Sequence, residues 1–255
     1  MTNTNQLQSV LFFDGQGTFI DCGSNIDLRE TSFTIEFWAK RNTVNQTDLV
    51  VEQGSITGGH ELHVGFRNNN MFTLAFFGDD LNTTDRYTDG NWHHWSCLYD
   101  RDRQHQGIVY DGNLIATRDS GIYQGSGNFY IGSRQGTQDF FDGVITELRL
   151  WNDIRTASEI QSNMNERLTG KEKGLIAYWP LDEGEGNLAK DRAKNGHNGT
   201  IASPTWKQME VPIQPASHKE SLGTGLQDYA YWYRWKQSLP QSSDSESFRR
   251  GRIWS

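Results

Sequence analysis

The feature that most constrains this chain is a series of short runs in which apolar and polar residues alternate, each ended by turn-forming residues. A period of two places successive side chains on opposite faces of a β-strand, so each run predicts a strand with one buried face. The turns contain Asp14-Gly15, 68–70, Asp89-Gly90 and Asp111-Gly112, which suit hairpins. The predicted strands are 9–13, 18–22, 33–41, 48–52, 61–67, 71–77, 92–99, 107–110, 113–118, 128–131, 143–151 and 174–180.

Strands at this spacing, with no alternation of strands and long helices, predict an all-β antiparallel sandwich or barrel. The 9 Trp, 9 Tyr and 13 Phe supply large side chains for its core. One short helix is predicted, because Thr156 and Glu159 have the spacing of a capping box. Ile160 and Met164 follow four residues apart and give the helix an apolar stripe, which we expect to pack against a sheet edge.

The net charge of −8 is unevenly distributed. Residues 207–255 hold seven Lys or Arg and five Asp or Glu, which leaves −10 for residues 1–206. Such an acidic body lacks the basic face that phosphate contacts need, so nucleic acid is not an expected partner. No apolar run has the length of a membrane span. The first ten residues do not resemble a signal peptide. The expected location is the cytoplasm or a particle or assembly, with export by a non-standard route left open.

Nine motifs occur in an order that identifies a family. They are LFFDG (11–15), FIDCG (19–23), SFTIEFWAK (32–40), DGNWHHW (89–95), VYDG (109–112), YIG (130–132), FDGVITELRLW (141–151), AYWPLDEG (177–184) and NGHNG (195–199). Over residues 9–206 the chain resembles the laminin-G-like domains of the concanavalin A-like lectin/glucanase superfamily, which also includes the pentraxins. The resemblance implies a jelly-roll sandwich of two antiparallel sheets.

The remaining chain divides into a linker and a tail. Residues 1–206 are predicted to form the sandwich, 207–228 a linker and 229–255 a docking tail. The tail is dense in aromatic and basic residues, which are enriched at protein interfaces. Its candidate docking residues are Tyr229, Tyr231, Trp232, Tyr233, Trp235, Arg249, Arg250, Arg252 and Trp254. The tail could dock on its own sandwich or on a protein partner.

Catalysis is not expected. Glucanases of the superfamily carry two closely spaced carboxylates on one strand, whereas Glu36 is the lone carboxylate on its predicted strand. His93 and His94 point to opposite faces of a strand and cannot bind one metal ion together. Cys22 and Cys97 are predicted to be reduced, with a single disulfide as the alternative.

The resemblance also implies a calcium site at a loop end of the sandwich. Gly58 stands where calcium-binding relatives have an Asp ligand, and the loop 133–136 is not acidic as it is in pentraxins. The remaining candidate ligands are Asp79, Asp80, Asp139 and Asp142. These acids could converge on Ca²⁺ or form a solvated acidic rim.

Sugar recognition needs exposed aromatic rings beside polar groups. Near the same loops the candidates are Phe77, Tyr87, Phe140 and Phe141, for each of which core packing is the alternative. The sequence thus predicts a non-catalytic, lectin-like module that recognises carbohydrate or a protein surface through loops at the end of the sandwich. The alternative is a structural subunit of a virion or multi-protein complex, anchored by its tail.

Overall fold

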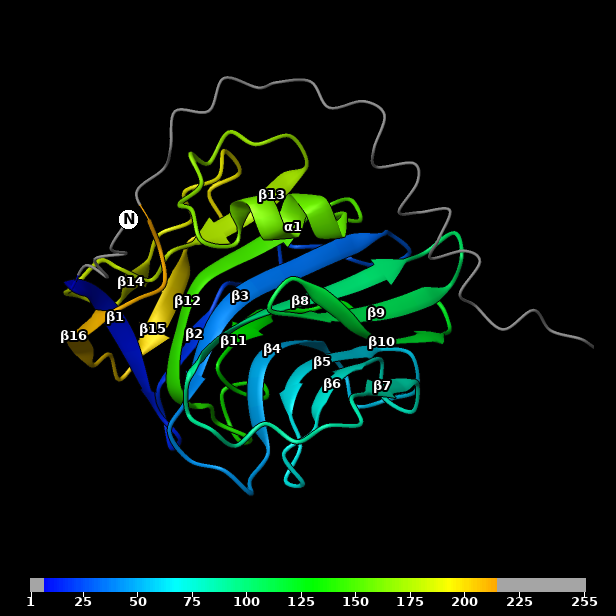
Figure 1. Cartoon of the computed structure of the whole chain (residues 1–255), viewed down its shortest axis with the longest axis horizontal. Coiled ribbons are helices and arrows are strands. Elements are labelled where there is room, and N and C mark those ends of the chain that lie inside the picture. Colours follow the sequence, from blue (N-terminus) through cyan, green and yellow to red (C-terminus); the bar gives the residue numbers. More distant parts are fainter. Residues whose placement is uncertain (1–6, 215–255) are drawn as a thin grey trace, which may run out of the picture. The chain divides into compact units, whose positions relative to one another are not determined.

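The computed structural model describes residues 7–214, so the predicted docking tail and most of the predicted linker lie outside the described residues. The described chain forms an antiparallel sandwich with one short helix, as predicted, and each of its two sheets has eight strands (Figure 1). Sheet 1 has the order β10 (Asn113–Asp119), β9 (His105–Tyr110), β8 (Trp92–Asp100), β3 (Phe33–Arg41), β12 (Asp142–Trp151), β1 (Leu7–Asp14) and β16 (Trp206–Glu210), and β13 (Leu175–Trp179) also pairs with β12. Sheet 2 has the order β14 (Leu188–Ala189), β15 (Gly199–Ala202), β2 (Phe19–Asp21), β11 (Phe129–Ile131), β4 (Asp48–Gly54), β5 (Glu61–Phe66), β6 (Phe72–Ala75) and β7 (Asp80–Asn82).

The core between the two sheets follows from the period-two pattern. In β3, Phe33, Ile35 and Phe37 belong to the main hydrophobic cluster, while Glu36 lies on the other face of the strand. Aromatic rings fill much of this core, and Phe72 of sheet 2 stacks on Trp95 of sheet 1 with ring centroids 3.9 Å apart. Such rings bury large areas each, so a chain of modest aliphatic content still forms a dense interior.

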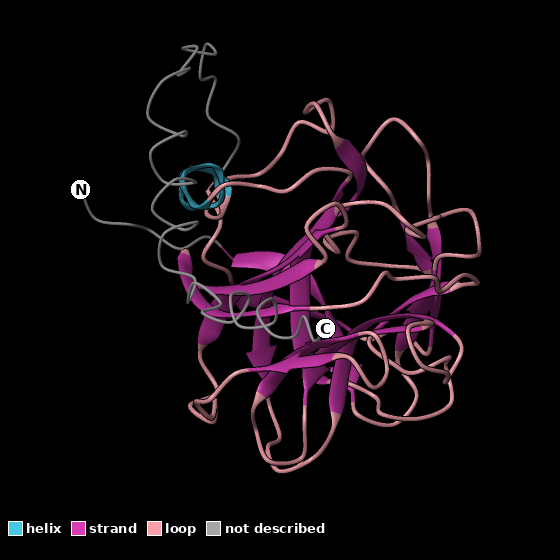
Figure 2. Cartoon of the chain, turned by 90° about the vertical axis from the view of Figure 1, so that its right-hand side faces the viewer, coloured by secondary structure: helices cyan, strands magenta, loops and turns pink. Residues whose placement is uncertain are grey.

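Helix α1 (Ala157–Asn163) lies against the outer face of sheet 1, outside the strands (Figure 2). The predicted capping box is confirmed, because the Thr156 hydroxyl accepts a hydrogen bond from the Glu159 amide and the Glu159 carboxylate accepts one from the Thr156 amide. Ile160 is buried, and Met164 packs into a second cluster that contains Trp38. No helix among residues 7–214 is long and apolar enough to cross a membrane.

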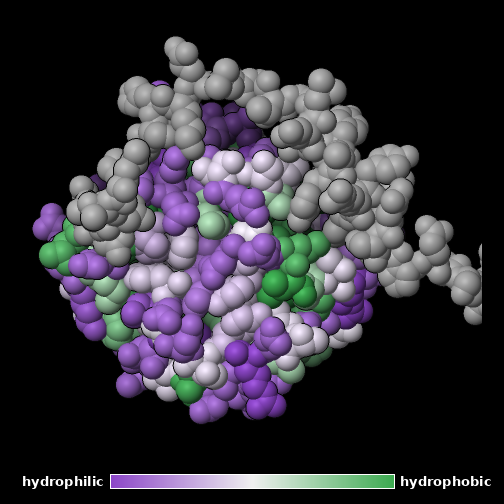
Figure 3. Space-filling view, viewed as in Figure 1, coloured by the Kyte–Doolittle hydropathy of each residue, from purple (hydrophilic) through white to green (hydrophobic). Residues whose placement is uncertain are grey.

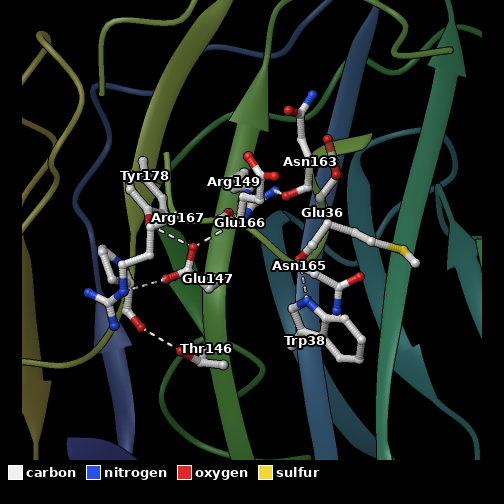
Figure 4. A network of polar contacts seen from close by, with 12 residues as sticks. Glu36, Trp38, Thr146, Glu147, Arg149, Asn163, Asn165, Glu166, Arg167 and Tyr178 are labelled. Atoms are coloured by element: carbon white, nitrogen blue, oxygen red, sulfur yellow. Dashed lines mark hydrogen bonds and ion pairs between the residues drawn. The ribbon is translucent and has the colours of Figure 1, made fainter. Parts of the chain in front are cut away.

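A buried polar network joins sheet 1 to the segment that follows α1 (Figure 4). Arg149 is 1% exposed and donates to a Glu147 carboxylate oxygen at 3.1 Å and to the carbonyls of Asn163 and Glu166. The Tyr178 hydroxyl donates to the same Glu147 oxygen at 2.6 Å. Arg149 therefore fixes the chain after α1 to sheet 1. Its hydrogen bonds are strong because the donor is charged and because they are shielded from water.

The sandwich extends beyond the boundary predicted at residue 206. Strand β16 crosses that boundary and pairs with β1 over five residues. Val211 and Ile213 are each 1% exposed and pack with Trp38. Residues 207–214, predicted as the start of a linker, thus belong to the sandwich. The linker interpretation failed there because β16 is an edge strand whose side chains are mostly exposed, which removes the alternating pattern.

Both cysteines are free and buried, and burial raises the pKa of each thiol. The thiolate is the reactive form, so neither should react in the folded protein. We expect a maleimide reagent to leave Cys22 and Cys97 unlabelled under native conditions at pH 7 and to label both in denaturant. Rapid labelling of the native protein would contradict the burial described here.

Candidate functional site

The outer face of sheet 2 carries aromatic side chains that the strand pattern directs outward. In β2, Ile20 is buried in the core while Phe19 and Asp21 flank it on the opposite face. In β11, Ile131 is buried and its neighbour Tyr130 is directed outward, opposite Asp21 in the register. The antiparallel pairing of β2 with β11 thus brings Phe19, Asp21 and Tyr130 onto one surface.

A third ring completes what we call the aromatic cluster, Phe19, Tyr130 and Phe140. The ring centroid of Phe19 lies 6.2 Å from that of Tyr130 and 6.3 Å from that of Phe140. All three side chains are partly exposed. Gly136 lies against the Phe19 ring, because a Cβ there would come within 2.6 Å of Phe19 Cζ. The loop before β12 therefore supports the cluster from one side.

Polar groups lie beside the rings. Asn128 Nδ2 is 3.0 Å from each carboxylate oxygen of Asp21, and the Gly23 amide donates to Asp21 Oδ1 at 2.8 Å. These bonds hold the carboxylate of Asp21 in a fixed direction while its side chain stays partly exposed. A carboxylate has about four lone-pair sites, so it can accept further hydrogen bonds from a ligand.

The segment 132–140 folds over the outer face of β4 and β5. The Gln135 amide donates to Glu52 Oε2 at 3.3 Å, and Gln135 Nε2 donates to the Gly54 carbonyl at 2.9 Å. Glu52 is 0% exposed as a result, and its Oε1 has no hydrogen-bond partner among the described residues. The exposed Gln135 side chain thus joins the surface that carries the aromatic cluster.

Arg134 ties the same segment to β5. Its guanidinium lies 2.8 Å from Glu61 Oε1, 3.1 Å from Asp139 Oδ2 and 3.1 Å from His63 Nδ1. The arginine side chain is only 17% exposed. One guanidinium therefore sits between two carboxylates and a ring nitrogen, and it fixes the loop that carries Gln135 and Phe140.

Burial controls the protonation of this cluster. Burial, and secondly the neighbouring carboxylate of Glu61, raise the pKa of Glu52 to about 8. Burial also raises the pKa of Glu61, against the attraction of Arg134. The pKa of His63 is held well below its usual value, again mainly by burial. At neutral pH Glu52 and His63 are thus mostly uncharged.

Glu52 and Glu61 are two neighbouring carboxyl groups that the sequence did not single out. Glycosidases need such a pair on either side of a substrate bond. Here both residues are 0% exposed, with Glu52 under Gln135 and Glu61 beside Arg134. In this arrangement neither carboxyl group can reach a sugar.

The four aromatic residues predicted to bind ligand have different surroundings. Phe140 belongs to the aromatic cluster, whereas Phe141 is fully buried and packs edge-on against Phe13, so it is a core residue. Tyr87 is half-buried against Trp95 and Tyr110, with ring centroids 4.7 and 4.8 Å away. Phe77 is 42% exposed in the turn between β6 and β7. Phe141 thus takes the alternative of core packing, whereas ligand binding by Phe77, Tyr87 and Phe140 stays a prediction.

The four acids predicted as calcium ligands each have a partner of their own. Three of them form ion pairs with an arginine: Asp79 with Arg118, Asp80 with Arg67, and Asp139 with Arg134. The fourth, Asp142, accepts hydrogen bonds from the side chains of Asn42 and Thr43. Within residues 7–214, no three His, Cys, Asp or Glu side chains form a group that could hold a metal ion. Calcium binding therefore stays a prediction that no contact described here supports.

His93 and His94 diverge, as their adjacency on one strand predicts. His93 contacts Asp89, Asp111 and Tyr110, whereas His94 is buried against Trp38.

A second surface of interest lies on sheet 1. Figure 3 shows a compact hydrophobic patch on that face, over the region of β9 and β10. Ile115 is 39% exposed, and the side chains of Leu98 and Leu114 meet above Gly107. This patch, Leu98, Leu114 and Ile115, has no polar groups of the kind that Asp21 and Asn128 supply, so it is a weaker candidate for a polar ligand.

Comparison with known proteins identifies the architecture. A family model described as the concanavalin A-like lectin/glucanases superfamily matches residues 14–161. No curated protein matches the chain. A Bacteroides ovatus structure, provisionally described as a carbohydrate-binding protein, is 21% identical with a TM-score of 0.67. The match covers 82% of this chain and spans 62% of the length of that one.

Two further structures are more distant. The CBM40 of a Ruminococcus gnavus sialidase is 19% identical, with a TM-score of 0.48, and the match covers 60% of this chain and 95% of the CBM40. The LG4-5 domains of the mouse laminin α1 chain are 16% identical, with a TM-score of 0.44, over 57% of this chain and 41% of that one. At such identities the similarity to these structures concerns the fold alone.

Proposed function

This chain belongs to the concanavalin A-like lectin/glucanases superfamily, and from this premise we propose that it is a non-catalytic module that binds carbohydrate on the outer face of sheet 2. The observation that carries the proposal is the aromatic cluster beside Asp21, Asn128 and Gln135. The Bacteroides ovatus relative, provisionally described as carbohydrate-binding, supports a role in binding rather than catalysis.

The chemistry of the surface suits a sugar. The C–H face of a pyranose or furanose ring packs on an aromatic ring, while its hydroxyl groups need fixed acceptors and donors alongside. Asp21 supplies acceptors, and the exposed side chain of Gln135 supplies its amide oxygen as an acceptor and, as a donor, the N–H that does not bond to the Gly54 carbonyl. The rings are supplied by β2, β11 and the loop before β12, so the rigid sandwich fixes their spacing.

The proposal moves the binding surface away from the sandwich-end loops that the sequence suggested. Phe140 is the one residue that belongs both to the aromatic cluster and to the ligand-binding residues predicted from the sequence. The alternative of a structural subunit rests on the tail, outside the described residues, and stays a prediction. The buried positions of Glu52 and Glu61 support the non-catalytic part of the proposal.

The test is a binding titration by calorimetry with the full chain and a panel of gluco-, galacto-, manno-, xylo- and arabino-oligosaccharides. Against a sugar that binds, Tyr130→Ala and Phe19→Ala should each weaken affinity about tenfold, because each removes stacking worth roughly 1.4 kcal/mol. Phe77→Ala is the matched control, since it removes an exposed ring at the end of the sandwich.

Circular dichroism should show that all three variants fold. Loss of affinity in Phe77→Ala but not in Tyr130→Ala would place binding at the loop end instead. Binding of no sugar in the panel would overturn the proposed function.

A further inference from the structure

We propose that this site selects uncharged glycans and rejects those bearing carboxylates, and that Asp21 is the specificity-determining residue. The inference rests on the proposed function and adds the class of ligand. The reason is the distribution of charge on the outer face of sheet 2. The carboxylate of Asp21 has uncharged hydrogen-bond partners, whereas Arg134 and Arg67 already form ion pairs with carboxylates of the protein.

Asp21 lies centrally in the site. In the register it is opposite Tyr130 of β11 on one side and Thr200 of β15 on the other, so a ligand on the aromatic cluster passes over it. Its hydrogen-bond partners are the amide of Asn128 and the backbone amide of Gly23, both of which are uncharged. Among residues 7–214 no Lys, Arg or His forms an ion pair with Asp21, so its negative charge faces the ligand uncompensated by the described part of the chain. This charge also contributes, after burial, to the raised pKa of the adjacent Tyr130 hydroxyl.

Two arginines of the described chain lie on this face, Arg134 and Arg67, and both are already paired. Arg134 is held by Glu61, Asp139 and His63, and Arg67 pairs with Asp80 at 2.9 Å. A site for an anionic sugar usually presents an arginine fork to the ligand carboxylate. Using either arginine here would leave a partly buried carboxylate of the protein without its partner, which is costly.

The matched probes are a glucose oligosaccharide and its glucuronate-containing counterpart, together with a galactose oligosaccharide and its galacturonate-containing counterpart; within each pair the sugars differ only in the carboxylate at C6. Like charges about 4 Å apart repel even in bulk water, and they repel more strongly at a protein surface. We therefore expect the full chain to bind the uncharged member of a pair at least about tenfold more tightly at low salt. Added salt should reduce that ratio, because it screens exposed charges.

Asp21→Asn is the decisive variant, because it keeps the shape of the side chain and removes its charge. It should weaken binding of the uncharged sugar by about threefold and bring the ratio of affinities to about one. Asp102→Asn is the control for the overall negative charge, since its side chain is 84% exposed in the turn after β8. It should leave the ratio unchanged.

The two proposals fail in different ways. If the wild-type chain binds both members of each pair equally, or if Asp21→Asn leaves the ratio unchanged, selection by Asp21 is wrong while the binding surface stands. If Tyr130→Ala has no effect on the uncharged sugar, the binding surface itself is wrong.

Discussion

Replacing Arg149 with methionine is expected to lower the free energy of unfolding by about 3–5 kcal/mol, the usual cost of removing one partner of a buried ion pair. Arg149 is 1% exposed, and its loss leaves the Glu147 carboxylate without its closest cation. The remaining cation, Arg167, has its Nε 3.8 Å from Glu147 Oε1. The carbonyls of Asn163 and Glu166 lose a donor at the same time.

Urea unfolding followed by tryptophan fluorescence measures this effect. Arg29→Met is the matched control, because Arg29 and Asp27 form an ion pair with both side chains about half exposed. Exposed pairs of this kind contribute little. Equal urea midpoints for Arg149→Met and the wild-type chain would show that the network in Figure 4 does not hold the segment after α1.

The second large effect concerns Glu52 and pH. Its pKa is about 8 in the folded protein against 4.5 as the ordinary value, so the folded state keeps a proton that the unfolded state releases between these values. The unfolding free energy should therefore fall as pH rises through this window, by up to about 1.4 kcal/mol per pH unit from this group. Above pH 8 the contribution is constant.

Glu52→Gln removes this titration while imitating the protonated side chain. We expect the variant to match the wild-type chain near pH 4.5 and to be increasingly more stable up to pH 8. Urea unfolding at pH 5, 7 and 9 measures the difference. The exposed Glu185→Gln is the control and should show no such trend. A difference between Glu52→Gln and wild type that does not change with pH would contradict the buried, proton-bearing state of Glu52.

Most of the fold could be predicted, because a strand with one buried and one exposed face leaves a period-two pattern of apolar and polar residues in the sequence. All twelve predicted strands are present, and β3 has the predicted limits. Four strands were missed: β7, β14, β15 and β16. β15 alternates buried and exposed residues, but Ile201 is the one large apolar side chain among its four residues, which is too weak a signal to predict a strand. The other three lack the pattern for physical reasons. β7 and β14 have three and two residues, too few for a period, and β16 is an edge strand with little to bury.

The candidate site was harder to predict, because its residues are far apart in the sequence and are brought together by the order of the strands in sheet 2. Phe19 and Tyr130 alternate with buried isoleucines, which does indicate that they point outward. That β2 pairs with β11, and that the loop before β12 brings Phe140 beside them, requires long-range pairing that no local pattern records.

Arg134 illustrates the same limit. The sequence of the loop 133–136 contains no acidic residue, whereas the fold places the guanidinium of Arg134 between Glu61 and Asp139. The role of an ion pair depends on which strands lie under the loop, and that information is absent from residues 133–136 alone.

Amide chemical shifts of the full chain, recorded while an uncharged oligosaccharide is added, test the central proposal most directly. The proposal predicts the largest shift changes in 19–21, 128–131 and 135–140, which carry the aromatic cluster, Asp21, Asn128 and Gln135. Changes centred instead on the turn that contains Phe77, or on Leu114 and Ile115, would contradict binding on the outer face of sheet 2.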